Sequence, residues 1–208
     1  MITLRKKFIS LFAVFCFALV VLFTSSNATP ARTMQRTRDA RLVRAAETVS
    51  GDRFTWAGST PAGVRVFAYA APNRATLNAI DKGFTELFTI ARRHNYRART
   101  SHADYTVFIA RPDRTTNDAG AYSPDIRISA AGNYAGSRYD RGGYLYAAGM
   151  VLSFEPCAFI IAEHTRDLNR VTEVVRYEGE HLVLYHNDQA RYRRTADHSR
   201  EGGHPILQ

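Results

Sequence analysis

The spacing of apolar side chains predicts two helices. In two stretches of the chain, apolar residues recur at intervals of three and four, which places them on one face of an α-helix. The first helix is expected to follow Asn73, whose side chain is suited to cap it. Its apolar positions are Leu77, Ile80, Phe84, Leu87, Phe88 and Ala91. The second helix is expected to begin near Thr165 or Asp167 and to end near Asp188.

Shorter runs of aromatic, β-branched and other apolar residues predict strands. Residues 53–58 and 63–70 flank a turn with Pro61 and Gly63, which is typical of a hairpin. Further strands are expected at residues 105–110, 126–131, 144–154 and 158–162. The first helix would connect two strands and cover one face of a sheet. The pattern therefore predicts an α+β fold, with a mostly antiparallel sheet of four to six strands and two main helices.

Composition and charge narrow the class of protein. The chain has 208 residues, of which 45% are hydrophobic and 23% charged, which is enough for one globular core. This balance excludes a disordered chain, a collagen-like repeat and a disulfide scaffold. The net charge of +9 comes mainly from arginines scattered between Arg32 and Arg200. Nucleic-acid binding needs cations clustered against phosphates, so we expect no nucleic-acid partner.

Residues 1–28 have the pattern of a secretory signal peptide. Basic residues at 5–7 precede an uncharged apolar run at residues 8–23, and small residues at 26 and 28 favour cleavage before Thr29. The run is shorter than the roughly 20 residues that span a bilayer, although an uncleaved anchor is the alternative. We therefore expect a secreted or periplasmic protein that contacts the membrane only transiently, through this peptide.

The rest of the chain divides into a linker and a domain. Residues 29–52 are polar and lack a sustained apolar stripe, which predicts a linker or a loosely attached helix. Residues 53–208 are expected to form a single α+β domain with a histidine-containing tail. After cleavage Cys157 is the only cysteine, so no internal disulfide can form. Its apolar neighbours predict a small buried thiol, and no histidine close in sequence offers it a catalytic partner.

The apolar stripe of the second helix contains two ionisable groups. At about 100° per residue, Glu178 and His181 share one side of the helix with Val171, Val174 and Tyr185. One interpretation is a buried pair that completes a hydrogen-bond network. The other is a functional site.

The segment around these two residues favours a site. It reads Tyr177-Glu178-Gly179-Glu180-His181 and resembles the HExxH motif of zincin metallopeptidases, with Tyr177 in place of the first histidine. In that family the motif lies on a helix beneath a mostly antiparallel sheet, both histidines bind zinc, and the glutamate polarises the metal-bound water. More loosely, the resemblance covers the order strand, helix, several strands and active helix over residues 64–190. It implies zinc as cofactor, His181 as a metal ligand and Glu178 as the catalytic base.

Other metal ligands are expected after the helix. Zincins commonly take a third ligand from this part of the chain, and His198 and His204 lie there in a glycine-bearing segment. The alternative is that both belong to a polar tail. Glu178 and His181, three positions apart, could also ligate one metal together. His186 should point away from His181 and be exposed.

Residues 134–144 combine tyrosine, glycine and arginine, which suits a binding cleft but also an ordinary surface hairpin. Asp140 could orient a ligand histidine.

Two functions follow from the sequence. One is an exported zincin-like protein, either a zinc-dependent peptidase acting on a protein or peptide or a lapsed relative of one. The other is a non-catalytic secreted or envelope protein that uses residues 134–144 to bind a peptide, a glycan or another subunit.

Overall fold

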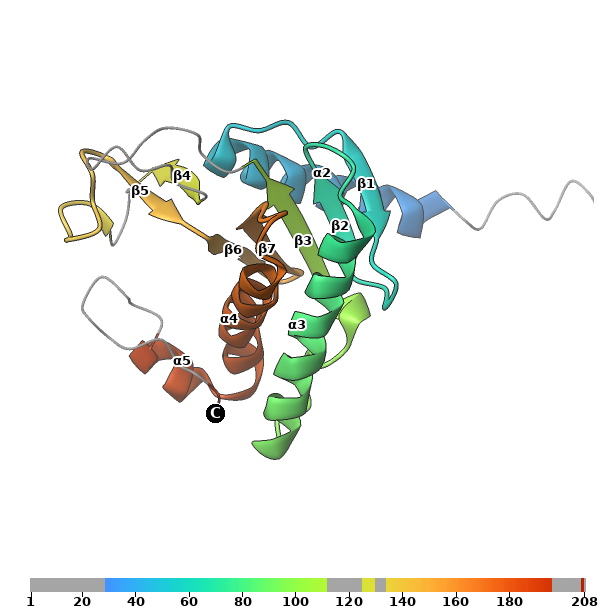
Figure 1. Ribbon diagram of the computed structural model, residues 1–208. Helices are drawn as coiled ribbons and strands as arrows, with labels where there is room; N and C mark the ends of the chain where they lie inside the picture. The colour runs from blue at the N-terminus through green and yellow to red at the C-terminus, as the bar shows by residue number, and fades with distance from the viewer. Residues whose placement is uncertain (1–28, 112–124, 130–133, 196–206, 208) are drawn as a thin grey trace, which may run out of the picture. The chain divides into compact units, whose positions relative to one another are not determined.

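The computed structural model describes residues 29–111, 125–129, 134–195 and 207 (Figure 1). Leu42–Gln208 form one compact unit, and the chain up to Arg41 belongs to another. The predicted signal peptide lies outside the described residues. Among the helices that are described, none is both long enough and apolar enough to cross a membrane.

A five-stranded mixed sheet forms the centre of the unit Leu42–Gln208, with the strand order β1-β2-β3-β7-β6. Its strands are β1 (Trp56–Ser59), β2 (Arg65–Ala68), β3 (Tyr105–Ala110), β6 (Gly149–Phe154) and β7 (Cys157–Ala162). β3 runs parallel to β2 and to β7, whereas β1 and β6 are antiparallel strands at the two edges. The α+β class and the hairpin are confirmed. The expected mostly antiparallel sheet is not confirmed, because both pairings of β3 are parallel.

A second sheet has two antiparallel strands, β4 (Ile126–Ser129) and β5 (Tyr144–Ala147). β5 leads almost directly into β6, so the single strand expected at residues 144–154 is divided near Ala148 between the two sheets. Along β4, buried and exposed positions alternate, because one side of this pair packs on the core.

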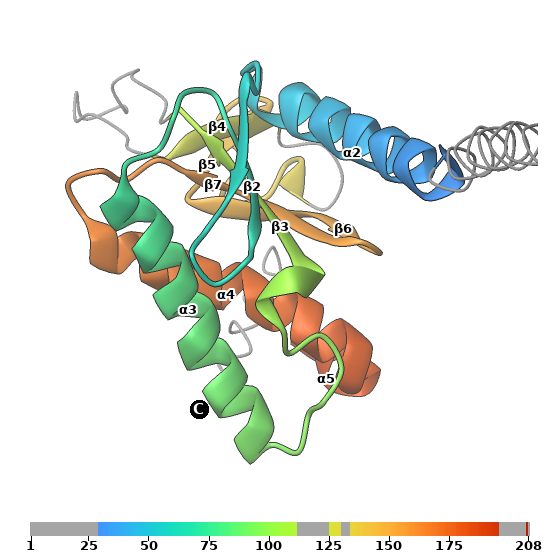
Figure 2. The ribbon, with the colours of Figure 1, turned by 90° about the vertical axis from the view of Figure 1, so that its right-hand side faces the viewer.

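The two expected helices are α3 (Arg74–Arg93) and α4 (Leu168–Asn187), which lie side by side against one face of the large sheet (Figures 1 and 2). The Asn73 side chain caps α3 by accepting a 2.8 Å hydrogen bond from the Thr76 backbone N–H, as predicted. The other helices are α2 (Thr29–Ser50), the short 3₁₀ helix η1 (His102–Asp104) and α5 (Gln189–Thr195).

The core has two parts, one on each face of the large sheet. Every residue of β3 and β7 is buried, because helices or the small sheet cover both faces. On one face, Phe159 and Ile161 pack with α3 and α4, and Leu207 is fully buried in the same cluster. On the other face, Phe108 and Ile160 pack with the small sheet and with Leu42 and Ala46 of α2. Buried core residues therefore occur before residue 53, where the domain was expected to begin.

Two glycines allow α3 and α4 to approach each other closely. A Cβ atom at Gly83 would lie 2.7 Å from the Thr172 carbonyl oxygen, and one at Gly179 would lie 2.5 Å from Leu87 Cδ2. Both distances are too short for real Cβ contacts. Gly179, the middle residue of the zincin-like motif, therefore has a packing role that does not depend on any catalytic function.

The first prediction tests the packing of α3. Phe84→Ala should lower the free energy of unfolding by about 3–5 kcal/mol, because the fully buried Phe84 ring packs on Tyr105 and Phe159 of the sheet. Thr85→Ala is the matched control at an exposed position of the same helix and should change stability by less than about 1 kcal/mol. Urea denaturation measures both changes. A loss below about 1 kcal/mol for Phe84→Ala would place this face of α3 away from the core.

Candidate functional site

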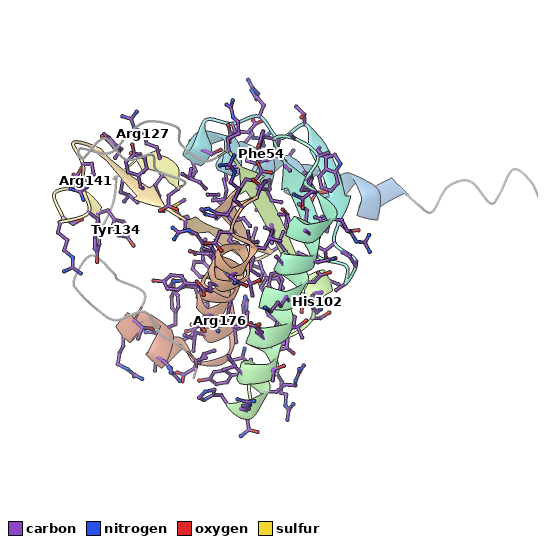
Figure 3. All side chains as sticks on the ribbon, in the orientation of Figure 1. Phe54, His102, Arg127, Tyr134, Arg141 and Arg176 are labelled. Atoms are coloured by element: carbon purple, nitrogen blue, oxygen red, sulfur yellow. The ribbon has the colours of Figure 1, made fainter. Side chains whose placement is uncertain are left out.

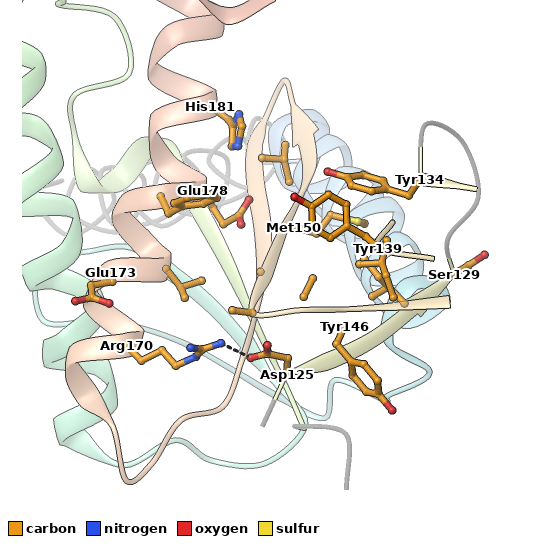
Figure 4. Close-up of a pocket in the computed structure, with 18 of the residues that line it drawn as sticks. Asp125, Ser129, Tyr134, Tyr139, Tyr146, Met150, Arg170, Glu173, Glu178 and His181 are labelled. Carbon is orange, nitrogen blue, oxygen red and sulfur yellow. Dashed lines mark hydrogen bonds and ion pairs between the residues drawn. The ribbon is translucent and has the colours of Figure 1, made fainter. Parts of the chain in front are cut away.

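Helix α4 forms one wall of a pocket of about 880 Å³, shown in Figure 4. Strands β4, β5 and β6, Asp125 just before β4, Tyr192 of α5 and the loop that carries Tyr134 and Tyr139 line the rest of it. The helix begins at Leu168, because the Asp167 carboxylate caps it by accepting a 3.0 Å hydrogen bond from the Arg170 backbone N–H. Its helical period then brings Glu178 and His181 to the pocket wall, as the sequence indicates.

Glu178 lies where α4 crosses β6. A Cβ atom at Gly149 would lie 2.8 Å from Glu178 Cγ and 3.0 Å from Glu178 Oε1, so the glycine leaves the room that this side chain occupies. The glutamate is only 6% exposed, and its carboxyl group points toward the pocket (Figure 4). Burial raises the pKa of Glu178 to about 8, because the charged form loses its hydration.

His181 and Tyr177 lie beside Glu178 on the same wall. The ring of His181 is 6.0 Å from that of Tyr177 and 6.4 Å from that of Tyr192, measured between centroids. Tyr177 is 40% exposed, and the loss of solvent around its hydroxyl group raises its pKa above the ordinary value. The phenol is therefore protonated near neutral pH, and it is not one of the nitrogen, sulfur or carboxylate ligands that zinc ordinarily takes.

The described residues do not by themselves make a metal centre. They contain no group of three or more histidine, cysteine, aspartate or glutamate side chains that could hold a metal ion. His198 and His204, the other predicted ligands, lie outside the described residues. The site as described thus offers His181 and the neighbouring Glu178, fewer donors than the three protein ligands of a catalytic zinc.

The tyrosine-rich loop faces α4 across the pocket. Tyr134 and Tyr139 line the pocket, and Figure 3 shows Tyr134 on a different side of the β4–β5 pair from Arg127. The Asp140 carboxylate accepts hydrogen bonds of 2.6 Å from the backbone N–H groups of Gly136 and Gly143, which lower its pKa. Its contacts thus shape the loop, and it is not one of the residues that line the pocket.

An ion pair at one end of the pocket could not be found from the sequence. Asp125 Oδ1 accepts a 2.6 Å hydrogen bond from Arg170 Nη2, and Arg170 Nε donates to His164 Nε2 over 3.3 Å. Burial and the adjacent guanidinium lower the pKa of His164, so this imidazole is neutral. The pair joins the segment just before β4 to the first turn of α4. The two partners lie 45 residues apart, and no local pattern marks either of them.

Cys157 is buried, as predicted, but the expectation that His186 is exposed was wrong. His186 is half-buried, because the end of α4 packs against the turn between β6 and β7. Its Nε2 lies 2.9 Å from the Phe154 carbonyl oxygen, to which it must donate, and 3.6 Å from Cys157 Sγ. Burial raises the pKa of Cys157 to about 12. A protonated thiol beside an imidazole N–H is not a nucleophile–base pair.

The site thus combines a buried carboxyl group, an imidazole and several phenols with an edge strand of the sheet. Such a pocket can bind a ligand through apolar contact, aromatic stacking and a few directed hydrogen bonds. Comparison with known proteins gave no match to a family model, a curated protein or a solved structure. The geometry of the pocket is therefore the basis for assigning a function.

The second prediction concerns the buried carboxyl group of Glu178. Between pH 4.5 and about 8 the folded protein keeps a proton on Glu178 that the unfolded chain releases, so wild-type stability should fall as the pH rises through this range. Glu178→Gln removes this titration. With a chelator present, the variant should therefore gain stability relative to wild type between about pH 5 and 8, by a few kcal/mol at about 1.4 kcal/mol per pKa unit.

Urea denaturation across this pH range measures the difference. Glu173→Gln, at an exposed position of the same helix, is the control and should follow the wild-type profile. The buried Glu180, whose pKa burial raises to about 7, contributes equally to all three proteins. Parallel profiles for wild type and Glu178→Gln would show that the carboxyl group titrates as if it were in solvent.

Proposed function

We propose that this protein is an exported, zincin-like polypeptide-binding protein whose pocket takes up an extended segment of a protein or peptide. One observation carries the proposal: Glu178 and His181, which match the zincin motif, line the same pocket as edge strand β6. The order of elements adds support, since β2, α3, the later strands and α4 follow the order that the resemblance implies. The predicted signal peptide is the basis for export.

Strand β6 suits an extended ligand. It pairs with β7 on one side, and on its other side it pairs with no strand of the described residues. Backbone N–H and C=O groups at such an edge can hydrogen bond to an added strand, while the neighbouring pocket accepts a side chain. Gly149 and Val151 of β6 line the pocket, so a bound segment would pass directly beside Glu178.

A second candidate function is zinc-dependent peptide hydrolysis, which the position of Glu178 beside His181 favours. His181 would hold the metal together with His198 or His204, and zinc would supply a Lewis acid that activates water. Glu178 would accept and return the proton of that water. Tyr177 does not fit the first ligand place, which is why binding is the better supported function.

The third prediction tests polypeptide binding. A peptide selected from a labelled pool of short unstructured peptides should bind the wild type and should bind Ala148→Phe at least tenfold more weakly, because the new ring fills the pocket beside β6. Fluorescence anisotropy measures both affinities. Ala57→Phe places the same ring on exposed β1, the other edge strand, and should bind like the wild type. If no peptide binds, or if the two variants lose affinity equally, the pocket is not a polypeptide site.

The fourth prediction separates hydrolysis from binding. If the protein is a peptidase, the purified chain should contain zinc, and His198→Ala or His204→Ala should lower the zinc content and remove the effect of a chelator on the melting temperature. Glu178→Gln should abolish hydrolysis of the selected peptide and keep the zinc. Elemental analysis and a cleavage assay measure these effects. A wild-type chain that contains no zinc and melts identically with and without chelator would exclude the peptidase and leave the binding function.

A further inference from the structure

The pocket carries an excess of acidic side chains although the whole chain has a net charge of +9. Its charged residues are Asp125, Arg170, Glu173 and Glu178. The guanidinium of Arg170 is paired with Asp125 at 2.6 Å, so these two charges offset each other. The carboxyl groups of Glu173 and Glu178 remain, and no described cationic side chain forms an ion pair with either of them. These two carboxyl groups disfavour an anionic ligand and favour a cation, next to which Glu178 would release its proton.

Glu178 is the acidic side chain that is placed to contact a ligand. It is more than nine-tenths buried, it points into the pocket, and it makes no hydrogen bond or ion pair with any described residue (Figure 4). A buried carboxyl group without a partner is costly, because it gives up hydration and gains nothing in exchange. A ligand that brings N–H donors would supply the missing partners. Glu180, the other buried glutamate of α4, faces away from the pocket and accepts a hydrogen bond from the Leu207 backbone N–H.

The walls of the pocket are aromatic as well. Five tyrosines line it together with Glu178. They come from the 134–144 loop, β5, α4 and α5 and are Tyr134, Tyr139, Tyr146, Tyr177 and Tyr192. The faces of such rings attract organic cations, and they attract them most strongly where water is excluded. The alkyl part of an amine gains apolar contact with the same rings, which an inorganic cation cannot do. Carboxyl group and rings together therefore favour an organic cation.

We infer that the pocket binds an organic cation, namely an alkylammonium or guanidinium group on an apolar stem, which donates hydrogen bonds to Glu178 between the tyrosine rings. In a polypeptide this group is a lysine or arginine side chain, so the inference rests on the proposed function for the identity of the ligand. A cation at this place also stabilises the ionised form of Glu178, because an opposite charge within a few ångströms lowers the pKa of a carboxyl group.

The fifth prediction uses two small probes that differ in charge and have the same ring. Benzylamine should bind the purified full chain at least tenfold more tightly than benzyl alcohol, as measured by NMR shift titration at neutral pH. Glu178→Gln removes the charge with nearly no change in side-chain volume, and this variant should bind the two probes equally. Glu180→Gln, the control outside the pocket, should keep the preference for benzylamine. Circular dichroism checks that both variants fold. Equal binding of both probes to the wild type, or no binding of either at tens of millimolar, would overturn the inference.

Two labelled peptides then separate this inference from the proposed function. They are identical except for one position, which is lysine in the first and norleucine in the second. Tighter binding of the lysine peptide, lost in Glu178→Gln, supports both the inference and the polypeptide-binding function. Equal binding of the two peptides leaves the binding function in place and overturns the charge selectivity. If benzylamine binds and neither peptide does, the cation site stands and the polypeptide-binding function is overturned.

Discussion

The close packing of α4 against its neighbours determines where the candidate site residues Tyr177, Glu178 and His181 lie. On one side, α4 touches α3 at Gly83 and Gly179, and on the other it touches β6 at Gly149. At each of these glycines an added methyl group would lie within 2.8 Å of a neighbouring atom, so a larger residue would separate the elements. Three glycines thus fix how α4 lies against α3 and β6. The side chains that α4 contributes to the pocket wall are positioned by the same contacts.

The same packing explains the unusual state of Glu178. The apolar stripe of α4 stabilises the fold by burying its valines and leucines, and Glu178 occupies a position in that stripe. A leucine there would complete the core at less cost. The chain instead retains a carboxyl group that opposes folding, which is a common feature of positions that serve a function. The proposed binding role of Glu178 therefore opposes the stability of the fold at this one position of the helix.

The sequence predicted the elements that depend on local pattern and missed those that depend on distant partners. The spacing of apolar residues located α3 and α4, and the helical period brought Glu178 and His181 to one wall. The parallel pairing of β2 with β3 follows from the crossover helix α3, which the pattern did indicate, so a mostly antiparallel sheet was the wrong conclusion there. The parallel pairing of β3 with β7 was not predictable, because it joins strands that are far apart in the chain. His186 was misplaced because its partner is the Phe154 carbonyl, a backbone group that no residue pattern reveals.

The Arg170–Asp125 pair links two parts of the structure that otherwise meet mainly across the pocket: helix α4 and the β4–β5 pair. Its side chains are 38% and 21% exposed, so dissolved ions can reach and screen it. Added salt therefore weakens this link between the two parts, whereas the apolar core beneath it is insensitive to salt. A rise in ionic strength would therefore loosen this end of the pocket lining before it affected the folding of the chain.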